Sequence, residues 1–516
     1  MRRAPRLLRY PSLAVRGFSE VRRPPFAPKP LLDIRHIRRH PELYAQTCRE
    51  RNYPEQVENA DRIVVLYGKW EDGEKSTLVW RKRARDLSSA MAGSPGNKAA
   101  LEKARAVKEQ LLQLASQSRE QLDEMEALAL QLPSLTSEDT PRGPKPVVAD
   151  YVNKAPASFA SKAEYKSHVD IGAELGILDL AAGAKTSGWG WYYLIGDGAR
   201  LEQALVQYAL SVASRRGWTL VSPPSIVYSH IGAACGFQPR DRHGETQIYK
   251  VAQSSGGDTK RRAPELILGG TSEIALAGIK ADSTINAADL PLRRVAVSRC
   301  YRAEAGSRGA STKGIYRVHE FTKVELFAWT APDAVSARRV LNDMVDMQKE
   351  LLAGLGLYCR VLIMPVADLG AAATYKVDIE AFFPGRRRLA SSIAKASSKD
   401  AKASPKGAKP ASTASSQDDD ASPKTNSGWG EVTSASLCSD YQTRRLATRL
   451  RPEPTSPDTS LEFPFTANAT ALAVPRVLAA LLENGWDNAS RTVAIPKCLR
   501  PWMDGKERIG PPAGAQ

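Results

Sequence analysis

The stretch CYRAEAGSRGASTKGIYRVHEFTKVE, residues 300–325, decides the fold that this sequence predicts. On either side of its middle, residues 294–298 and 323–329 are rich in β-branched and aromatic side chains, which is typical of strands. The middle, 306–314, is rich in glycine, serine and arginine, which is typical of a hairpin loop. We therefore predict two antiparallel strands joined by a polar loop.

Several side chains of this hairpin have the chemistry of a nucleotide site. Alternate residues of a strand share one face, so Arg302 and Glu304 are expected to point the same way. The returning strand carries Arg317, Phe321 and Glu325. A guanidinium can bind a phosphate, and a carboxylate and a ring can hold a base. A surface ion pair beside a core phenylalanine has the same pattern, so the pattern alone leaves both interpretations open.

Length, charge and cysteine spacing limit the class of protein. The chain has 516 residues, which predicts about two to four domains, and 42% of them are hydrophobic, as in globular proteins. Lys and Arg number 73 against 56 Asp and Glu, and the resulting charge of +17 favours a polyanionic partner. The six cysteines form no C-x-x-C pair, which argues against a zinc ribbon or a disulfide framework. No apolar run is long enough to predict a spanning helix.

The N-terminus is basic. Its first 19 residues hold five arginines and no acidic residue, which is typical of a mitochondrial presequence; a basic tail is the alternative. Four prolines follow between 24 and 30. We predict a transit peptide and linker over 1–30, and a short tail over 501–516.

Residues 57–132 predict a long helical hairpin. Apolar residues recur every three or four positions on both sides of a Gly-Ser-Pro-Gly turn at 93–96, which indicates an antiparallel coiled coil with arms about 50 Å long. In the second arm the expected seam is Leu101, Ala104, Leu111, Ala115, Leu122, Met125 and Ala129. Basic residues near the tip are candidates for RNA phosphates, or are simply solvated flanks: Arg81, Lys82, Arg83, Arg85, Lys103 and Arg105.

A low-complexity segment interrupts the C-terminal half. Residues 389–427 are mostly Ala, Ser, Lys, Pro and Asp, and carry no aromatic side chain. Such a composition buries too little apolar area to offset the entropy of ordering, so we predict a disordered surface insertion.

These segments together resemble a known family. The hairpin resembles the second signature motif of class II aminoacyl-tRNA synthetases, GWTLVSPP (217–224) their first and TALAVPRVLAALLEN (470–484) their third. Three further segments are similar to seryl-tRNA synthetases in particular: Thr271-Ser272-Glu273, HVDIGAELGILDL (168–180) and WGEVTSASLCSDYQTRRL (429–446).

The resemblance implies an α+β fold and an activity. A tRNA-binding domain with the helical arm would span 31–140, and a class II catalytic domain, an antiparallel sheet flanked by helices, would span 141–500. The expected reaction is the ATP-dependent activation of L-serine and its transfer to the 3′ end of tRNA(Ser) in the mitochondrial matrix, with use in the cytosol left open. The expected assembly is a homodimer without a membrane association. The alternatives are a synthetase-like RNA- or partner-binding protein that has lost ligase activity, and a synthetase for another small amino acid.

The resemblance also implies roles for particular residues. Arg302, Arg476 and Glu431 would be catalytic. The expected ATP-binding residues are Arg302, Ala303, Glu304, Val318, Phe321, Glu431, Val432, Thr433, Ser434 and Arg476. Mg²⁺ would be held by Glu431 and Ser434. The expected serine-binding residues are Thr271, Ser272, Glu273, Glu325 and Thr470. Among them, the ammonium group of serine would be bound by Thr271, Glu273 and Glu325, and its hydroxyl by Glu325 and Thr470.

The sequence departs from the family pattern at three positions. Glu320 stands where glutamine is usual, and Ala469 where glycine is usual. Leu437 stands where an asparagine is usual, which removes an amide that the resemblance places near the serine site.

Overall fold

The computed structural model describes residues 24–92, 98–161, 165–237, 247–253, 264–304, 314–386, 428–453 and 460–511. The predicted presequence up to residue 23, the tip turn at 93–96, the hairpin loop up to 313, the insertion 389–427 and the end of the C-terminal tail lie outside the described residues.

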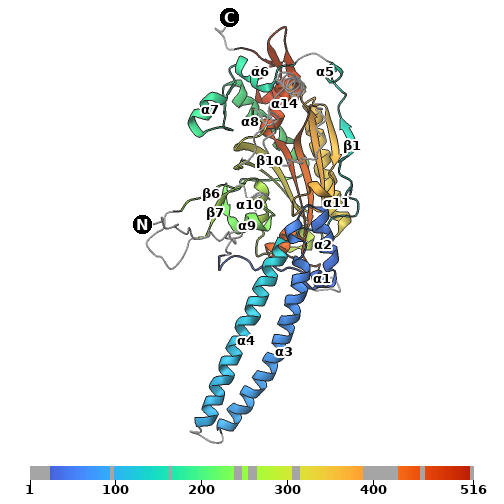
Figure 1. Cartoon of the computed structure of the whole chain (residues 1–516). Coiled ribbons are helices and arrows are strands. Elements are labelled where there is room, and N and C mark those ends of the chain that lie inside the picture. Colours follow the sequence, from blue (N-terminus) through green and yellow to red (C-terminus); the bar gives the residue numbers. More distant parts are fainter. Residues whose placement is uncertain are drawn as a thin grey trace, which may run out of the picture.

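An eight-stranded sheet forms the centre of the catalytic body (Figure 1). Every neighbouring pair is antiparallel except β4 and β9, which are parallel. The order across the sheet is β1 (Val147–Val152), β11 (Cys359–Ile363), β12 (Tyr375–Phe382), β13 (Trp429–Ser439), β15 (Phe465–Ala473), β10 (Glu320–Thr330), β9 (Leu292–Tyr301) and β4 (Thr219–Val221). The predicted hairpin is thus confirmed as the pair β9 and β10, and the α+β class with it.

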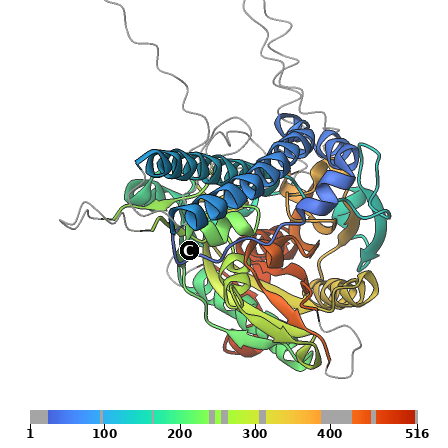
Figure 2. The ribbon, with the colours of Figure 1, turned by 90° about the horizontal axis from the view of Figure 1, so that it is seen from below.

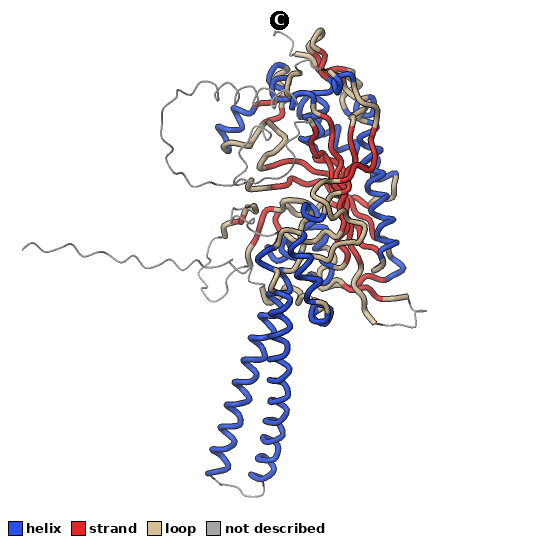
Figure 3. Tube along the Cα trace, turned by 45° about the vertical axis from the view of Figure 1, so that its right-hand side comes forward, coloured by secondary structure: helices blue, strands red, loops and turns tan. Residues whose placement is uncertain are grey.

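Both faces of β10 are covered, which explains its nearly unbroken apolar sequence. Val324 and Leu326 belong to the main core, where α8 (Asp197–Arg215), α11 (Ala334–Gly354) and α14 (Val474–Gly485) pack on the sheet (Figure 3). Phe327 and Trp329 belong to a second core on the other face. There they meet α9 (Ser229–Ala234), α10 (Ser272–Gly278) and a small sheet of β5 (Ile226–Tyr228), β7 (Leu266–Leu268) and β6 (Lys250–Val251).

Short elements complete the body. Before α8 come α5 (Ala157–Ala160), α6 (His168–Glu174), β2 (Leu178–Asp179), α7 (Leu180–Ser187) and β3 (Tyr193–Leu194). Towards the C-terminus lie α13 (Tyr441–Arg445), β14 (Arg449–Arg451), which pairs with β8 (Thr284–Asn286), and a small sheet of β16 (Trp486–Asp487), β17 (Thr492–Ala494) and β18 (Arg508–Ile509). Short 3₁₀ helices occupy Pro54–Gln56, Ala287–Asp289, Val366–Asp368 and Lys497–Trp502. Among the described residues, no helix is long and apolar enough to cross a membrane.

The helical arm projects away from the body (Figure 1), and in the view from below its two long helices lie in front of the body (Figure 2). Two short helices, α1 (Ile34–Arg39) and α2 (Pro41–Glu50), lead into α3 (Asn59–Ala92) and α4 (Lys98–Gln131), which pack against each other. Each long helix has 34 residues and is therefore about 50 Å long. The predicted hairpin is confirmed in type and extent.

The seam of α4 differs from the predicted one. Leu101, Ala115 and Leu122 are exposed, whereas Val107 and Leu128, which the predicted seam omits, are buried. Ser118 takes part in the seam: its Oγ accepts a 3.1 Å hydrogen bond from Trp70 Nε1 and donates one of 3.0 Å to Glu74. A polar contact therefore replaces one apolar layer of the seam.

Buried arginines join the arm to the body. Arg51, after α2, is fully buried and donates to the carbonyls of Ser134 and Gly370, and to that of Ala373 at 2.8 Å. From the body, Arg445 of α13 donates to the carbonyls at positions 130 and 132, at the end of α4. The base of the arm is thus fixed to the body by charged hydrogen bonds in a desolvated junction.

Candidate active site

One cavity collects most of the predicted site residues. It opens on the face of the sheet that carries α10, and it is lined from β10, β13, β15 and the starts of α10 and α14. Of the predicted serine- and ATP-binding residues, those on the cavity wall are Thr271, Glu273, Arg302, Glu304, Val318, Phe321, Glu325, Glu431, Val432, Thr433, Ser434, Thr470 and Arg476.

Side chains on one face of β10 lie in a row along the cavity. Phe321, Lys323 and Glu325 alternate along the strand, so their side chains share the cavity face. The register places Thr470 of β15 directly opposite Glu325, and the Thr470 hydroxyl lies 3.4 Å from Glu325 Oε2. A stacking ring therefore stands at one end of this row, and a carboxylate with a hydroxyl at the other.

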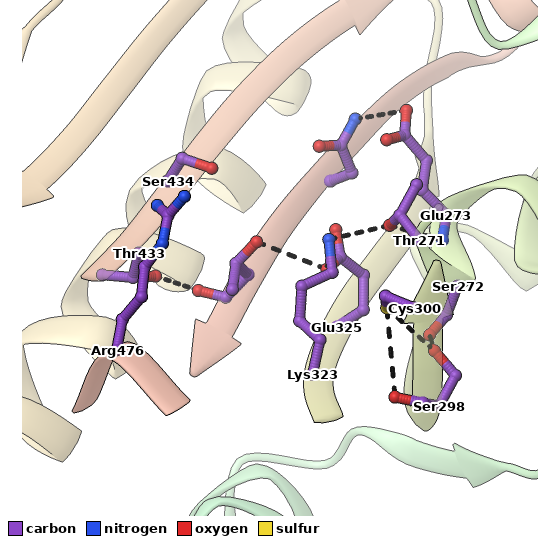
Figure 4. A network of polar contacts seen from close by, with 12 residues as sticks. Thr271, Ser272, Glu273, Ser298, Cys300, Lys323, Glu325, Thr433, Ser434 and Arg476 are labelled. Atoms are coloured by element: carbon purple, nitrogen blue, oxygen red, sulfur yellow. Dashed lines mark hydrogen bonds and ion pairs between the residues drawn. The ribbon is translucent and has the colours of Figure 1, made fainter. Parts of the chain in front are cut away.

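The carboxylate end is dominated by Glu273 in the first turn of α10 (Figure 4). Its Oε1 accepts two amide hydrogen bonds, at 2.6 Å from Gln442 and at 2.9 Å from Asn468. Burial, and then the nearby Glu325 carboxylate, raise the pKa of Glu273 to about 7. Thr271 caps the same helix with its side chain, which turns its hydroxyl toward this end of the cavity.

Two arginines far apart in the sequence line the other end. Arg302 lies with its guanidinium carbon 5.3 Å from the centre of the Phe321 ring. Arg476, in the first turn of α14, donates to the Glu431 carbonyl at 3.2 Å and lies 3.4 Å from its carboxylate. Burial would raise the pKa of Glu431, but Arg476, with other nearby cations, lowers it below its ordinary value. This end therefore combines cationic groups with an ionised carboxylate.

The expectation that Arg302 and Glu304 share a strand face is wrong. β9 ends at Tyr301, and Glu304 has a left-handed backbone with φ of 46°. Among the described residues, the last backbone hydrogen bond between this limb and the returning one is donated by Arg302 N to the His319 carbonyl at 2.9 Å. After it the chain leaves the β9–β10 pairing and turns. Both side chains nevertheless line the cavity, with Glu304 paired to Arg317.

A β-bulge shapes the wall formed by β13. The register with β12 shifts between Thr433 and Glu431, so Val432 is an extra residue. Without the bulge, Glu431 and Ser434 would point to opposite faces; with it, both line the cavity. The Thr433 hydroxyl is engaged within the protein, because it donates to the Thr470 carbonyl and accepts a 2.7 Å hydrogen bond from Gln348.

Two predicted residues do not line the cavity. The Ser272 hydroxyl forms a 2.6 Å hydrogen bond with Ser298 Oγ instead, under the first turn of α10. Ala303 donates its backbone N–H to the Gln247 carbonyl at 3.1 Å. Residues that line the cavity beyond the predicted set are Phe237, Tyr316, Arg317, Lys323, Ser436, Asn468, Ala473 and Pro475. Of these, Lys323 could have been found, because it stands at the strand period between Phe321 and Glu325.

Leu437 lies outside the cavity. It is buried in the main core, while its neighbour Ser436 faces the cavity. The Asn468 amide lines the carboxylate end and donates to Glu273. The departure at 437 therefore leaves the amide contacts of Glu273 in place.

The basic residues predicted to bind tRNA are all exposed on the arm: Arg81, Lys82, Arg83, Arg85, Lys103 and Arg105. The first four lie in the distal half of α3, and the other two near the start of α4. The distal half of the arm is far from the body, which contains the cavity (Figure 1). These residues are therefore separated from the candidate site within one chain.

Comparison with known proteins identifies the family. Residues 31–136 match the seryl-tRNA synthetase N-terminal domain, and residues 249–485 match the tRNA synthetase class II core domain (G, H, P, S and T). The chain is 38% identical to the mitochondrial serine–tRNA ligase of Saccharomyces cerevisiae over 407 residues, which cover 78% of each chain. It is 34% identical to the mitochondrial enzyme of Schizosaccharomyces pombe, over 92% of this chain and 88% of the relative.

A solved structure agrees over nearly the whole length. The seryl-tRNA synthetase of Pyrococcus horikoshii, complexed with ATP, superposes with a TM-score of 0.76 at 28% identity, covering 93% of this chain and 100% of that one. The fold, the two matched domains and the related ligases agree with one another. The chain therefore belongs to the serine–tRNA ligase family of class II aminoacyl-tRNA synthetases.

Proposed function

We propose that this protein activates L-serine with ATP to seryl-adenylate and transfers the seryl group to the 3′ end of tRNA(Ser) in mitochondrial translation. The observation that carries the proposal is the arrangement of one cavity. Arg302 and Arg476 line one end of it, and Thr271, Glu273 and Glu325 line the other. A triphosphate and a small amino acid would meet between these two ends.

The chemistry needs positioning and charge neutralisation. Serine's carboxylate would attack the α-phosphate of ATP and release pyrophosphate, so no covalent intermediate with the enzyme is required. Arg302 would bind the α-phosphate and stabilise the transition state, and Arg476 would bind near the γ-phosphate. Phe321 would stack on the adenine, and Glu304 would accept a hydrogen bond from its amino group.

Mg²⁺ fits the β13 wall of the cavity. The bulge at Val432 brings a carboxylate, Glu431, and a hydroxyl, Ser434, to the same face, and both are the oxygen ligands that Mg²⁺ prefers. Within the described part of the chain, no group of three or more His, Cys, Asp or Glu residues could hold an ion by itself. Glu431 and Ser434 would therefore supply part of the shell, and the nucleotide phosphates the rest. The ion would neutralise phosphate charge.

Serine would be selected by its hydroxyl. Glu325 and Thr470 lie directly opposite each other in the ladder, and both are buried. Alanine would place a methyl group against this polar pair in a desolvated site, which costs free energy that serine does not lose.

The arm would bind tRNA through its shape and backbone phosphates. We further propose a homodimer in which the arm of one subunit guides tRNA into the cavity of the other.

The mitochondrial location is supported by the arginine-rich, acid-free start of the sequence and by the mitochondrial relatives in Saccharomyces cerevisiae, Schizosaccharomyces pombe and Mus musculus.

Serine-dependent ATP–pyrophosphate exchange by the purified protein tests the first step. We expect exchange with serine and little with threonine or alanine. Arg302→Ala should abolish it, because the α-phosphate loses its cation. Charging of mitochondrial tRNA with labelled serine tests the second step. A folded wild-type protein without serine-dependent exchange would instead support a binding module that lacks ligase activity.

A further inference from the structure

Lys323 has no role in the function proposed above, yet its side chain lies in the middle of the cavity. It is buried on β10, and its ammonium lies 2.5 Å from Glu325 Oε2 and donates to Thr271 Oγ1 at 2.8 Å (Figure 4). Burying an ammonium is unfavourable unless it is paired. The two contacts therefore satisfy the charge of Lys323, and in doing so they use two groups that the substrate would need.

Those two groups are the ones expected to bind the ammonium of serine. A primary ammonium held by a threonine hydroxyl and a glutamate carboxylate has the same chemistry whether it belongs to lysine or to a free amino acid. The lysine ammonium thus stands in for that of the substrate. Serine cannot bind in the expected pose while Lys323 keeps both contacts.

The charge of the cavity allows such an exchange. At the serine end, the described cavity wall carries two carboxylates, Glu273 and Glu325, against the single ammonium of Lys323. A second ammonium would balance the second carboxylate when both are ionised. The serine ammonium can therefore enter while the lysine remains in the cavity, provided that Lys323 moves along the wall.

We propose that Lys323 holds the substrate-ammonium position in the empty site, and that serine displaces its ammonium onto the substrate carboxylate. This inference rests on the proposed function. The order of side chains on β10 sets the direction of the move: Lys323 stands between Phe321, at the nucleotide end, and Glu325, at the serine end. The carboxylate of serine must point toward the nucleotide to reach the α-phosphate, and so it points toward Lys323.

The displaced ammonium would act beside Arg302. Serine's carboxylate carries a negative charge to an already anionic phosphate, and a second cation between them reduces the repulsion. Lys323 would then be a catalytic residue, because it touches the substrate. It would also favour amino acids over amino alcohols, since only a carboxylate gives the displaced lysine a new partner.

The test compares serine with serinol, which keeps the ammonium and hydroxyl but lacks the carboxylate. Binding of each is measured by calorimetry with wild-type protein and with Lys323→Met, which keeps an unbranched chain of nearly the same length but removes the ammonium. In the variant, serinol meets no competing ammonium, so we expect its Kd to fall by about tenfold, the equivalent of one ion-paired contact. The Kd of serine should fall less than that of serinol, because the serine carboxylate no longer contacts the lysine ammonium in the variant. The Kd of serinol divided by that of serine should therefore fall.

Lys376→Met is the matched control. It removes another lysine from the same sheet, one that pairs with Asp378 at 2.8 Å and does not line the cavity, so the ratio should stay unchanged. Parallel weakening of serine and serinol in Lys323→Met would overturn the proposal, because it would show that the lysine only supports the pocket.

A crystal structure of the wild-type protein with serine decides the matter even if Lys323→Met fails to fold. The proposal requires that the serine ammonium lies between Thr271 and Glu325 and that Lys323 contacts the carboxylate. A lysine that keeps both of its present contacts would refute it. Neither measurement needs turnover, so absence of ATP–pyrophosphate exchange in the wild type would count against the proposed function and not against the displacement.

Discussion

Gln442 donates a 2.6 Å hydrogen bond to Glu273 across 169 residues of sequence. Gln442 is fully buried in α13, and its own carbonyl oxygen accepts a 2.7 Å hydrogen bond from the Thr466 hydroxyl. This second contact fixes the orientation of the amide, so that its N–H₂ faces Glu273. Because the acceptor is a buried carboxylate, Gln442 positions the group that is proposed to bind the substrate ammonium.

Replacing Gln442 by methionine should weaken serine binding. A hydrogen bond to a charged group contributes about 1.5–3 kcal/mol, so the KM for serine should rise by more than tenfold. The KM for ATP should change little, because the side-chain contacts of Gln442 are with Glu273, at the serine end of the cavity, and with Thr466. Gln442→Glu should be worse than Gln442→Met, since it places a carboxylate against Glu273. Equal effects on the KM of both substrates would show that Gln442 supports only the overall fold.

Serine binding should depend on pH through Glu273. Its pKa, raised to about 7 by burial and by Glu325, means that the carboxyl group is neutral below about pH 7 and ionised above it. Only the ionised form attracts an ammonium. The KM for serine should therefore rise about tenfold for each pH unit well below 7. Exchange assays between about pH 5.5 and 8.5 span that pKa, and Glu273→Gln should flatten the profile. In Gln442→Met the midpoint should move to higher pH, because that hydrogen bond favours the charged form.

His168 joins the returning limb of the hairpin to α14. Its Nδ1 lies 2.8 Å from Glu483 Oε1, and its Nε2 accepts a hydrogen bond from Ile315 N at 3.3 Å. An accepting Nε2 requires the proton on Nδ1, which is then donated to Glu483. His168→Ala should loosen the residues that follow Ile315, including Val318 on the nucleotide wall. We expect the KM for ATP to rise about tenfold, from the loss of one or two hydrogen bonds, while the KM for serine stays nearly constant.

Ser167→Ala provides the control for that variant. Ser167 caps the same helix, α6, through a capping box with Asp170, whereas the contacts with Ile315 and Glu483 come from His168. The substitution should lower the melting temperature slightly without changing the KM for ATP. If both variants raise that KM equally, the effect comes from the helix and not from the contact of His168 with the hairpin.

Neutralising the basic residues of the distal arm should affect only the tRNA step. Replacement of Arg81, Lys82, Arg83 and Arg85 by alanine should raise the KM for tRNA. The slope of the logarithm of the tRNA-binding constant against the logarithm of the salt concentration should become shallower by about one for each phosphate that the arm no longer neutralises. Exchange should be unchanged, since the cavity lies in the body.

Lys75→Ala is the control for the arm variants. Lys75 is exposed on the same helix but pairs with Glu71 and Asp72, so its ammonium is already balanced by neighbouring carboxylates. We expect its removal to leave the KM for tRNA nearly constant. If this single substitution weakens tRNA binding as much as the four together, the effect comes from the general charge of the arm and not from a site near its tip.

Local patterns placed only part of the site, and the roles of its residues came from the resemblance to a family. The alternation of β10 alone places Phe321 and Glu325 on one face, whereas the register that sets Thr470 opposite Glu325 depends on the pairing of β10 with β15. The same rule failed for Glu304, because the strand ends at Tyr301 and the alternation ends with it. It also gives no sign of the bulge at Val432, which depends on how β13 pairs with β12.

The sequence by itself determined the features that depend on residues close together in the chain. The repeated apolar positions predict the two long helices of the arm, and the β-branched flanks with a polar loop predict the hairpin of β9 and β10. What only the tertiary structure decided is the environment of Glu273. Its partners come from α13 and β15, and the lysine that competes for its neighbours comes from β10. Distant elements meet there because burial of their apolar faces brings them together, and no local periodicity encodes which polar groups then lie within hydrogen-bonding distance.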